Sequence, residues 1–185
     1  MARIQLIEAN QAPLSARGFY AGGDPGPITK ALAQVPELLE VAMPFFGAAL
    51  GPSFLTLRVK ELVILRVSAL LECQYCINAH TVVARDAGLT RDEVAALRDE
   101  LPIDRGFTDG AELVLVRWVD AIATGRGKVD PDLAEEFVAT WGDPAVVELT
   151  MLAGATMALN RFCSTLELPT ADETATRLTE VGFPS

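Results

Sequence analysis

The chain has few residues of several chemically informative kinds. Its 185 residues include three cysteines, one histidine and only 6% aromatic side chains. Three cysteines are too few for the disulfide framework that supports a small secreted protein. Basic residues are also scarce, 15 against 25 acidic ones, which gives a net charge of −10. Nucleic acids and anionic membranes require basic patches on a partner, so this composition argues against both.

Long apolar segments are lacking as well. The longest uncharged run, from Val41 to Leu57, is interrupted by glycine and proline. It is shorter than the about 18–20 residues that a membrane-spanning helix requires. We interpret it as buried core or as a subunit interface. The N-terminal MARIQLIEANQAPLSAR has no apolar core of signal-peptide length, so we predict a cytoplasmic protein.

Nor does any stretch alternate apolar and polar residues over the length of a strand. Alanine and leucine are abundant, and both favour helix. The sequence predicts an all-α fold, a compact multi-helix single domain over residues 1–185. The domain begins with an irregular arm at 1–27 that holds at most short helices. That arm is expected to lie on the surface of this subunit or of a neighbouring one. Caps and breakers predict helices at 36–50, 57–71, 74–87, 90–100, 109–124, from 131, at 144–166 and at 171–181, with a loop at 102–107.

Most of the reactive side chains lie between Glu61 and His80, in ELVILRVSALLECQYCINAH. Cys73 and Cys76 form a C-x-x-C pair, and His80 follows four residues later. On a helix these spacings place the three side chains on one face. A thiolate is the reactive form of cysteine, and a nearby imidazole lowers the cost of forming it. A second thiol one turn away can trap an oxidised sulphur as a disulfide, so the motif is a candidate dithiol redox site.

Other interpretations of these residues remain open. A free cysteine is often a plain buried hydrophobe, and we interpret Cys163 in MALNRFCSTL in this way. Zinc is a second possibility for the motif, because Cys73, Cys76 and His80 supply three ligands and Glu61 or water a fourth. The chain has no second C-x-x-C and no second histidine, so a closed zinc site lacks ligands and we expect no metal. A glycine-rich dinucleotide fingerprint is also missing, and we expect no nicotinamide cofactor.

Glu61 reaches the motif only if the chain turns back. In one continuous helix it would lie about 28 Å from His80, at ~1.5 Å per residue. If the chain reverses near 70–73, the two helices form an antiparallel hairpin and Glu61 faces His80. The carboxylate could then orient the imidazole and stabilise its charged form. The alternative is that Glu61 pairs with Arg58 or Lys60 on a solvated face, and no glycine or proline marks the turn.

The motif resembles that of the alkyl hydroperoxidase D-like proteins, within the broader carboxymuconolactone decarboxylase family. The match is a glutamate, a C-x-x-C pair twelve residues on, and a histidine four residues after the second cysteine. The peroxidase-related branch of the family is also similar in four further segments, so the resemblance covers most of the chain. These are IQLIEANQAPLSARGFY, LTLRVKELVILRV, HTVVARDAGLTRDEVAALR and ALNRFCSTLELP. The decarboxylase branch lacks the cysteine pair, so decarboxylation is disfavoured.

The resemblance implies an all-helical homo-oligomer, as a dimer, trimer or hexamer, that reduces peroxides. It implies that Cys76 is the thiolate beside His80, that Cys73 is its disulfide partner, and that Glu61 and His80 form a proton relay. Tyr75 stands where the best-known hydroperoxidases have a further relay histidine. A phenol with an ordinary pKa near ~10 is a poor base at neutral pH.

We therefore predict a thiol-dependent alkyl hydroperoxidase. The apolar sequence around the motif favours an organic hydroperoxide as substrate. An external dithiol of the lipoyl or thioredoxin-like kind is expected to reduce the disulfide again. The alternative, which Tyr75 favours, is a non-catalytic dithiol redox sensor or an oligomeric binding protein of the same family.

Overall fold

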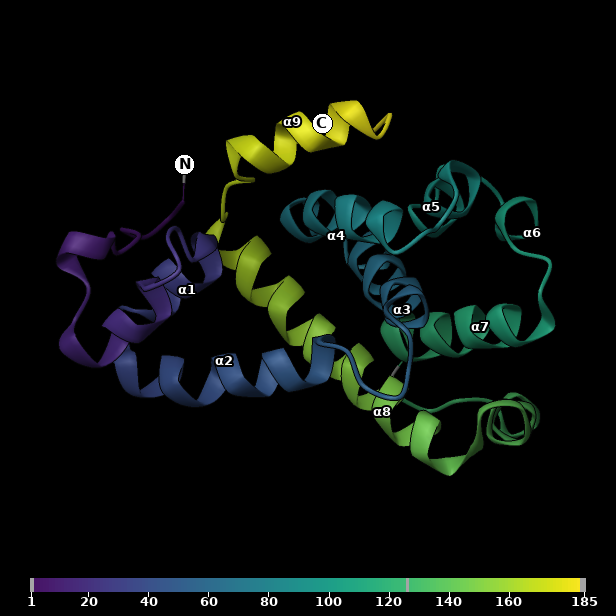
Figure 1. Ribbon diagram of the computed structural model, residues 1–185. Helices are drawn as coiled ribbons and strands as arrows, with labels where there is room; N and C mark the ends of the chain where they lie inside the picture. The colour runs from purple at the N-terminus through teal and green to yellow at the C-terminus, as the bar shows by residue number, and fades with distance from the viewer. Residues whose placement is uncertain (1, 126, 184–185) are drawn as a thin grey trace.

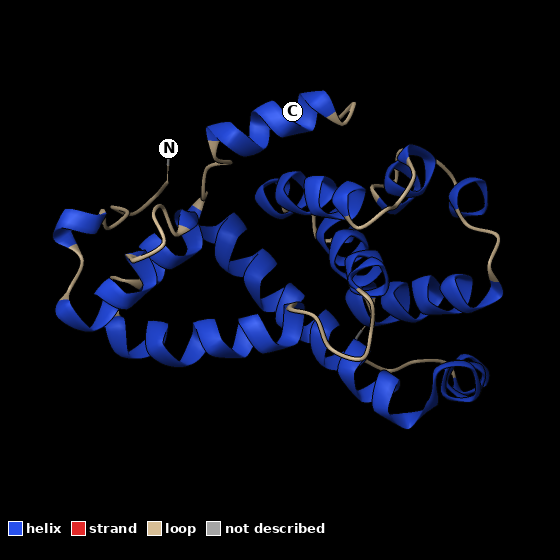
Figure 2. Ribbon diagram, viewed as in Figure 1, coloured by secondary structure: helices blue, strands red, loops and turns tan. Residues whose placement is uncertain are grey.

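The computed structural model describes residues 2–125 and 127–183, and within them all regular structure is helical, which confirms the predicted all-α fold (Figures 1 and 2). The N-terminal segment contains two short 3₁₀ helices, Ala9–Gln11 and Leu14–Tyr20. The α-helices are α1 (Gly26–Leu32), α2 (Pro36–Leu50), α3 (Leu57–Leu70), α4 (Gln74–Asp86), α5 (Arg91–Leu97), α6 (Ile103–Gly106), α7 (Gly110–Thr124), α8 (Pro131–Leu166) and α9 (Asp172–Glu180). None of these helices is both long enough and apolar enough to cross a membrane.

Helix α3 lies at the centre of the molecule and packs against α4, α7 and α8 (Figure 1). Its N-terminus is capped by the side chain of Thr56, which accepts a hydrogen bond from the Val59 backbone. Leu62, Val63 and Leu65 are almost completely buried although they lie on different faces of the helix. A helix that is apolar on most sides is stable only when neighbours surround it. This central position fixes where Glu61, on the same helix, can point.

The chain reverses between α3 and α4 through a tight turn without glycine or proline. The backbone N–H of Cys73 donates to the carbonyl of Ser68 at 3.0 Å, and that of Glu72 donates to Ala69 at 3.0 Å. This pair of bonds closes the helix end as a Schellman motif. Glu72 takes the left-handed conformation, with φ of 54°, that glycine usually occupies there. The antiparallel hairpin is therefore present, at a position where the usual sequence signal is missing.

Helix α8 carries the C-terminal part of the chain across the molecule to the cysteines (Figure 1). Asp130 caps its start, with Pro131 at the first helical position, as the sequence predicts. Gly142, with φ of 74°, changes the direction of the helix just before the second cap signal at Asp143 and Pro144. The long segment beyond Pro144 is the second predicted helix, and its last turns hold Cys163 beside the hairpin.

Two expectations from the sequence are wrong. Residues 102–107 are not only loop, because α6 forms there. Gly106 lets α6 approach α5 closely, since a Cβ at this position would lie 2.9 Å from the Ala96 Cβ. Of the two interpretations of the run from Val41 to Leu57, buried core does not fit, because the side chains of Val41 and Phe54 are 65% and 66% exposed, and the subunit interface stays a prediction. Helix α1 was not predicted from the sequence, and α5 ends at Leu97 rather than near 100.

The N-terminal arm lies on its own chain. The backbone N–H of Arg3 donates to Leu166 at the end of α8, and that of Ile7 donates to Lys30 in α1. Tyr20 is buried and its hydroxyl donates to the Ile7 carbonyl at 2.8 Å. The first residues of the arm pack over the small apolar cluster that contains the three cysteines. The arm therefore forms part of the cover over the cysteines.

A buried lysine ties three helices together. The side chain of Lys60 on α3 is fully buried, and its ammonium lies 2.7 Å from the carboxylate of Glu148 on α8. The same ammonium donates to the carbonyls of Ala49 and Gly51 at the end of α2. A buried ammonium is tolerated only when its donors are satisfied, and these contacts satisfy them. They also fix the end of α2 against the core.

Candidate redox site

Glu61 and His80 meet across the α3–α4 hairpin. The Nδ1 atom of His80 lies 3.0 Å and 3.2 Å from the two carboxylate oxygens of Glu61. Glu61 is 2% exposed, whereas the His80 side chain is 21% exposed. A carboxylate that accepts the Nδ1 proton fixes the ring orientation and leaves Nε2 available to exchange a proton. The contact expected for a hairpin is thus present.

Glu61 does not pair with Arg58 or Lys60, because each of these cations has other partners. Arg58 forms ion pairs with Glu93 on α5 and Glu112 on α7. Lys60 is occupied by its own buried partner on α8. Both cations point away from Glu61, which is therefore directed to the imidazole.

Cys73 and Cys76 are both buried free thiols, and their sulphur atoms lie 2.7 Å apart. Cys73 occupies the N-cap position of α4, and Cys76 lies in the first turn. The cap position holds Cys73 at the end of the helix where backbone N–H groups are unpaired and negative charge is favoured. The two thiols are therefore close enough to form a disulfide with little movement.

Cys163 lies beside this pair, a position that its interpretation as a plain buried hydrophobe does not predict. It is buried, as expected, but its sulphur and those of Cys73 and Cys76 all lie within 4.8 Å of one another. It reaches them from α8, a helix distant in the sequence. The sequence gives no signal for this contact, because a single cysteine in an apolar helix has the same local sequence whichever residues it packs against.

The three thiols differ in pKa, and therefore in how readily each loses its proton. Hydrogen bonds from Cys163 and Cys76 lower the pKa of Cys73 to about 3. The hydrogen bond from Cys163 also favours a Cys76 thiolate, but donation to Cys73 and burial outweigh it and raise the pKa of Cys76 to about 12. Donation to Cys73 and Cys76 raises the pKa of Cys163 as well. A negative charge in the cluster is therefore favoured most at Cys73.

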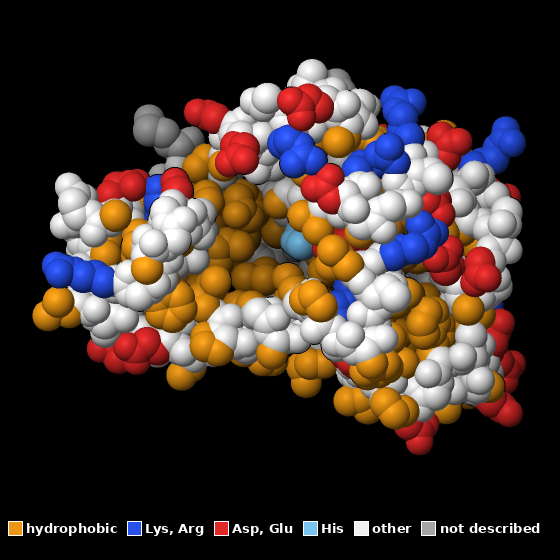
Figure 3. Space-filling view, viewed as in Figure 1, with side chains coloured by type: hydrophobic (Ala, Val, Ile, Leu, Met, Phe, Trp, Pro, Cys, Tyr) orange, Lys and Arg blue, Asp and Glu red, His pale blue; other side chains and the backbone are white. Residues whose placement is uncertain are grey.

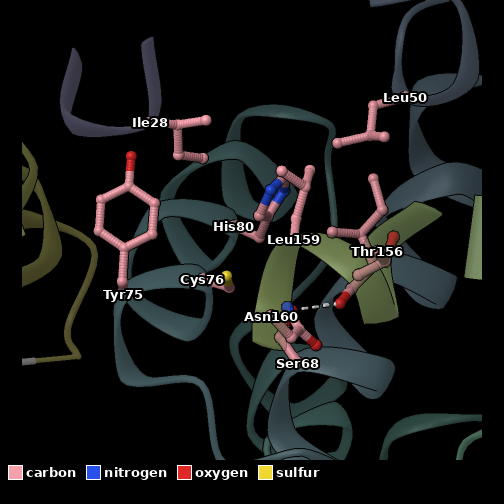
Figure 4. Close-up of a pocket in the computed structure, with 10 residues that line it drawn as sticks. Ile28, Leu50, Ser68, Tyr75, Cys76, His80, Thr156, Leu159 and Asn160 are labelled. Atoms are coloured by element: carbon pink, nitrogen blue, oxygen red, sulfur yellow. Dashed lines mark hydrogen bonds between the residues drawn. The ribbon is translucent and has the colours of Figure 1, made fainter. Parts of the chain in front are cut away.

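Accessibility favours the other member of the pair. Cys76 is 5% exposed and Cys73 is fully buried. Cys76 also lines a cavity of about 30 Å³ together with His80 (Figure 4). In the space-filling view the single histidine, His80, is visible at the back of a hollow with apolar walls (Figure 3). A small molecule entering this hollow therefore reaches Cys76 before Cys73.

The apolar walls continue into a larger groove. Hydrophobic side chains line the cavity beside Cys76: Ile28, Leu50, Ile64 and Leu159. Leu159 also lines a neighbouring groove of about 210 Å³ between α1, α2 and α8. The other side chains of this groove are apolar too: Leu32, Leu38, Ala42, Phe46, Ala158 and Phe162. This larger apolar groove therefore adjoins the cavity at Leu159.

Tyr75 does not take the place of a relay base. In Figure 4 its hydroxyl points toward Ile28 and not toward the Cys76 sulphur. Burial, followed by the charge on the nearby cysteines, raises the pKa of Tyr75 above its ordinary value. The phenol therefore stays protonated at neutral pH and can only donate a hydrogen bond.

Two polar residues of the site were not identified from the sequence. Asn160 on α8 donates to the hydroxyl of Ser68 on α3 at 3.2 Å (Figure 4). Both are buried and line the cavity next to Cys76. Asn160 also favours the thiolate form of Cys76 and so lowers its pKa in part. Neither residue lies in a recognisable motif, so only the packing of α8 against the hairpin reveals them.

The zinc interpretation requires the ligand atoms of Cys73, Cys76 and His80 to converge, and they do not. Among the residues that the structure describes, the ligand atoms that converge belong to Cys73, Cys76 and Cys163. His80, proposed as a third ligand, instead binds Glu61 through Nδ1. The motif thus separates into a cluster of thiols and a histidine–carboxylate pair.

Part of the chain, including the candidate site, matches the sequence model of a known family. Residues 36–121, which include Glu61, both cysteines of the motif and His80, match the sequence model of the carboxymuconolactone decarboxylase family. This match, together with the fold, supports assigning the chain to the carboxymuconolactone decarboxylase family. The fold is also that of a solved protein described as an alkylhydroperoxidase AhpD core. No curated protein matches the chain.

Solved structures share the fold of this chain over almost its whole length. A peroxidase-related protein from Silicibacter sp. superimposes with a TM-score of 0.81 at 17% identity, covering 94% of this chain and 93% of that one. A peroxidase-related protein with an alkylhydroperoxidase AhpD core, from Ralstonia eutropha, gives 0.80 at 16% identity, covering 94% of each chain. A variant of the debrominase Bmp8, solved in complex with 2,3,4-tribromopyrrole, gives 0.78 at 16% identity, covering 98% of this chain and 100% of that one. At these identities the likeness establishes the fold alone.

Proposed function

We propose that this protein is a thiol-dependent peroxidase that reduces organic hydroperoxides. The observation that carries the proposal is the arrangement around Cys76. This residue shares a small cavity with His80, Glu61 holds the other side of the imidazole ring at 3.0 Å, and a second thiol lies 2.7 Å away. Thiol peroxidases need an accessible sulphur, a proton carrier and a resolving thiol.

In the proposed reaction a hydroperoxide enters the cavity with its oxygens toward Cys76. The Cys76 thiolate forms when the Cys76 proton passes to Cys73 across 2.7 Å, a step that runs against the order of their pKa values and therefore contributes to the barrier. The Cys76 thiolate attacks the nearer oxygen, the O–O bond breaks, and an alkoxide leaves as Cys76 becomes a sulfenic acid. His80 supplies the proton that the alkoxide takes up, and Glu61 keeps the ring oriented.

The sulfenic acid is then resolved inside the protein. The Cys73 sulphur attacks the Cys76 sulphur, water leaves, and a Cys73–Cys76 disulfide forms. Two electrons have now passed from the thiols to the peroxide. An external dithiol, of the lipoyl or thioredoxin-like kind, returns them by thiol–disulfide exchange. Tyr75 acts at most as a hydrogen-bond donor in this scheme, because its phenol stays protonated.

The apolar groove supports an organic substrate. A cavity of about 30 Å³ accepts little more than the two peroxide oxygens. The neighbouring groove of about 210 Å³ is lined by aliphatic and aromatic carbon and can bury an alkyl or aryl tail. Burial of each methylene group contributes about 0.8 kcal/mol. We therefore expect cumene hydroperoxide to react faster than hydrogen peroxide.

The test is consumption of cumene hydroperoxide by purified protein with dithiothreitol or dihydrolipoamide as reductant. Continuous turnover, lost in Cys76→Ser, supports the peroxidase. One stoichiometric oxidation without turnover under either reductant supports the redox sensor instead. No oxidation of the cysteines at all, read by mass spectrometry, refutes both.

A debrominase with the same fold suggests a second substrate class for the same dithiol. Reductive removal of bromine from a brominated pyrrole would replace carbon–bromine by carbon–hydrogen, release bromide and oxidise two thiols to a disulfide. The apolar groove suits such a ring as well as it suits a hydroperoxide tail. Release of bromide from tribromopyrrole, without peroxide turnover, would favour this candidate.

We also propose that the protein assembles as a homo-oligomer. Apolar side chains on α2 and α8 are exposed side by side: Val41 is 65%, Phe45 46%, Val147 67% and Met151 54% exposed. Monomers rarely expose contiguous apolar patches, and a second copy would cover this one with the same surface. Light scattering should give a multiple of the 19.8 kDa subunit mass. A monomer at every concentration would refute the assembly.

A further inference from the structure

The position of Cys163 suggests a third participant in the redox chemistry. Its sulphur lies within 4.8 Å of both Cys73 and Cys76, and the three form one buried apolar cluster with Ala31 and Leu168. The cysteine contributes to this cluster from α8, whereas the other two come from the start of α4. A side chain that only filled space at position 163 would need no sulphur. The Cys163 thiol instead lies beside the sulphurs of Cys73 and Cys76.

We propose that Cys163 is a second resolving thiol, able to form a disulfide with Cys76 in place of Cys73. The inference rests on the proposed peroxidase function. After Cys76 is oxidised to a sulfenic acid, the Cys163 sulphur attacks it, its proton leaves with the hydroxyl as water, and a Cys76–Cys163 disulfide forms. Electrons balance as in the Cys73 reaction, because two thiols are oxidised for one peroxide reduced.

The geometry allows the reaction without unfolding. A disulfide needs sulphurs at about 2.05 Å, and thiols within 4.8 Å can reach this by side-chain rotation with small shifts of the helix ends. Cys163 lies in the last turn of α8, where its carbonyl accepts from the Leu168 backbone N–H at 3.0 Å and Glu167 ends the helix with a left-handed φ of 51°. Movement there disturbs the core less than movement of α3 would.

The cluster also brings the third thiol into chemical contact with the other two. The Cys163 sulphur lies within 4.8 Å of the sulphurs of both Cys73 and Cys76, with all three side chains buried. It is 1% exposed, so bulk peroxide does not reach it first. A buried thiol of this kind is poorly suited to attack peroxide and well suited to trap a neighbouring sulfenic acid. Cys163 would protect Cys76 from over-oxidation whenever Cys73 reacts slowly with the sulfenic acid.

The chain allows a clean test, because it contains only these three cysteines. The variants are Cys73→Ser, Cys163→Ser and the double variant, each treated with one equivalent of cumene hydroperoxide. After alkylation of free thiols, mass spectrometry of peptides identifies bridges and over-oxidised cysteines. We expect a Cys76–Cys163 disulfide in most of the Cys73→Ser protein, and sulfinic acid at Cys76 only in the double variant. Sulfinic acid at equal levels in Cys73→Ser and the double variant would overturn the proposal.

A second oxidant separates this proposal from the peroxidase itself. Diamide oxidises two neighbouring thiols to a disulfide, is itself reduced to the hydrazine, and needs no proton relay. If peroxide fails to react with the natural protein, the peroxidase proposal fails, and diamide still tests the third thiol. A Cys76–Cys163 bridge in diamide-treated Cys73→Ser supports the proposal. Free Cys76 and Cys163 there, while the natural protein forms Cys73–Cys76, overturns it.

Folding does not confuse the result. Circular dichroism melting identifies any variant that fails to fold, and the natural protein then carries the test. Peptides of the natural protein, after a limiting amount of diamide, should contain a minor fraction in which Cys163 is bridged to Cys76. Complete absence of Cys163 from every bridge in the natural protein would overturn the proposal.

Discussion

Replacement of Glu61 by glutamine tests the proton relay directly. The carboxylate is 2% exposed and contacts His80 at 3.0 Å, with no solvent between them. Glutamine keeps the shape and still offers an oxygen to Nδ1–H, so the ring stays in place while the negative charge disappears. The protonated imidazole that gives its proton to the leaving alkoxide is then less well stabilised, because it has lost its negative partner.

The size of the effect follows from this arrangement. A general acid–base group contributes about 10²–10⁴-fold to a rate. A partner that acts through it, as Glu61 does through His80, contributes about 10–100-fold. We expect Glu61→Gln to slow oxidation of Cys76 by cumene hydroperoxide within that range. Single-turnover stopped-flow mixing of the reduced protein measures it without any contribution from the reductant.

The control is Glu148→Gln. This change also removes a carboxylate that pairs with a base on α3, but the base is Lys60 and lies away from the cavity. It should lower stability and leave the oxidation rate of folded protein unchanged. A double-variant cycle completes the test, since Glu61→Gln in a His80→Gln background should have no further effect. Oxidation of Glu61→Gln within twofold of the natural rate, or a full effect without His80, would refute the relay.

Three other predictions concern stability. Glu72→Gly should raise the free energy of unfolding by roughly 0.5–1 kcal/mol in a urea titration, because glycine takes the left-handed conformation without strain; a loss of stability would contradict the turn. Lys60→Ala should lower it by about 3 kcal/mol or more, because the change removes a buried ammonium from Glu148 and two carbonyls; a loss below about 1 kcal/mol would show that this contact is unimportant. Burial raises the pKa of Glu93, but the bonds from Arg58 and from a backbone N–H outweigh it and leave the pKa below the ordinary 4.5. Its contribution is therefore complete above pH 4.5 and is lost as the pH falls through the folded-state pKa, so melting temperatures of Glu93→Gln and the natural protein should converge in acid.

Local signals in the sequence predicted much of the fold. Capping residues such as Thr90, Asp109 and Asp130 begin helices where expected, because a cap depends on a few adjacent residues. The hairpin was inferred from the need to bring Glu61 to His80 and not from the turn itself. Glu72 adopts a conformation that its residue type rarely signals, so propensity alone would have missed it.

What the sequence did not reveal depends on contacts between distant segments. Cys163 and Asn160 reach the site because α8 crosses the hairpin, and one sequence carries no measure of that crossing. The exposure of Val41 and Phe54 was not predictable either, because hydrophobic composition alone does not distinguish a buried core from an exposed apolar surface. The roles assigned to Cys76 and Cys73 remain predictions, because exposure favours one sulphur and charge the other.

The turn at Glu72 has a consequence for how this protein can change over time. Each residue of a helix advances it by about 100°. Deletion or insertion of one residue between Leu71 and Cys73 would therefore rotate α4 and turn His80 away from Glu61. The same rotation would carry Cys76 out of the cavity. The identity of the turn residues is free to vary, whereas their number is not, so related chains that keep this chemistry should preserve the twelve-residue spacing from the glutamate to the first cysteine.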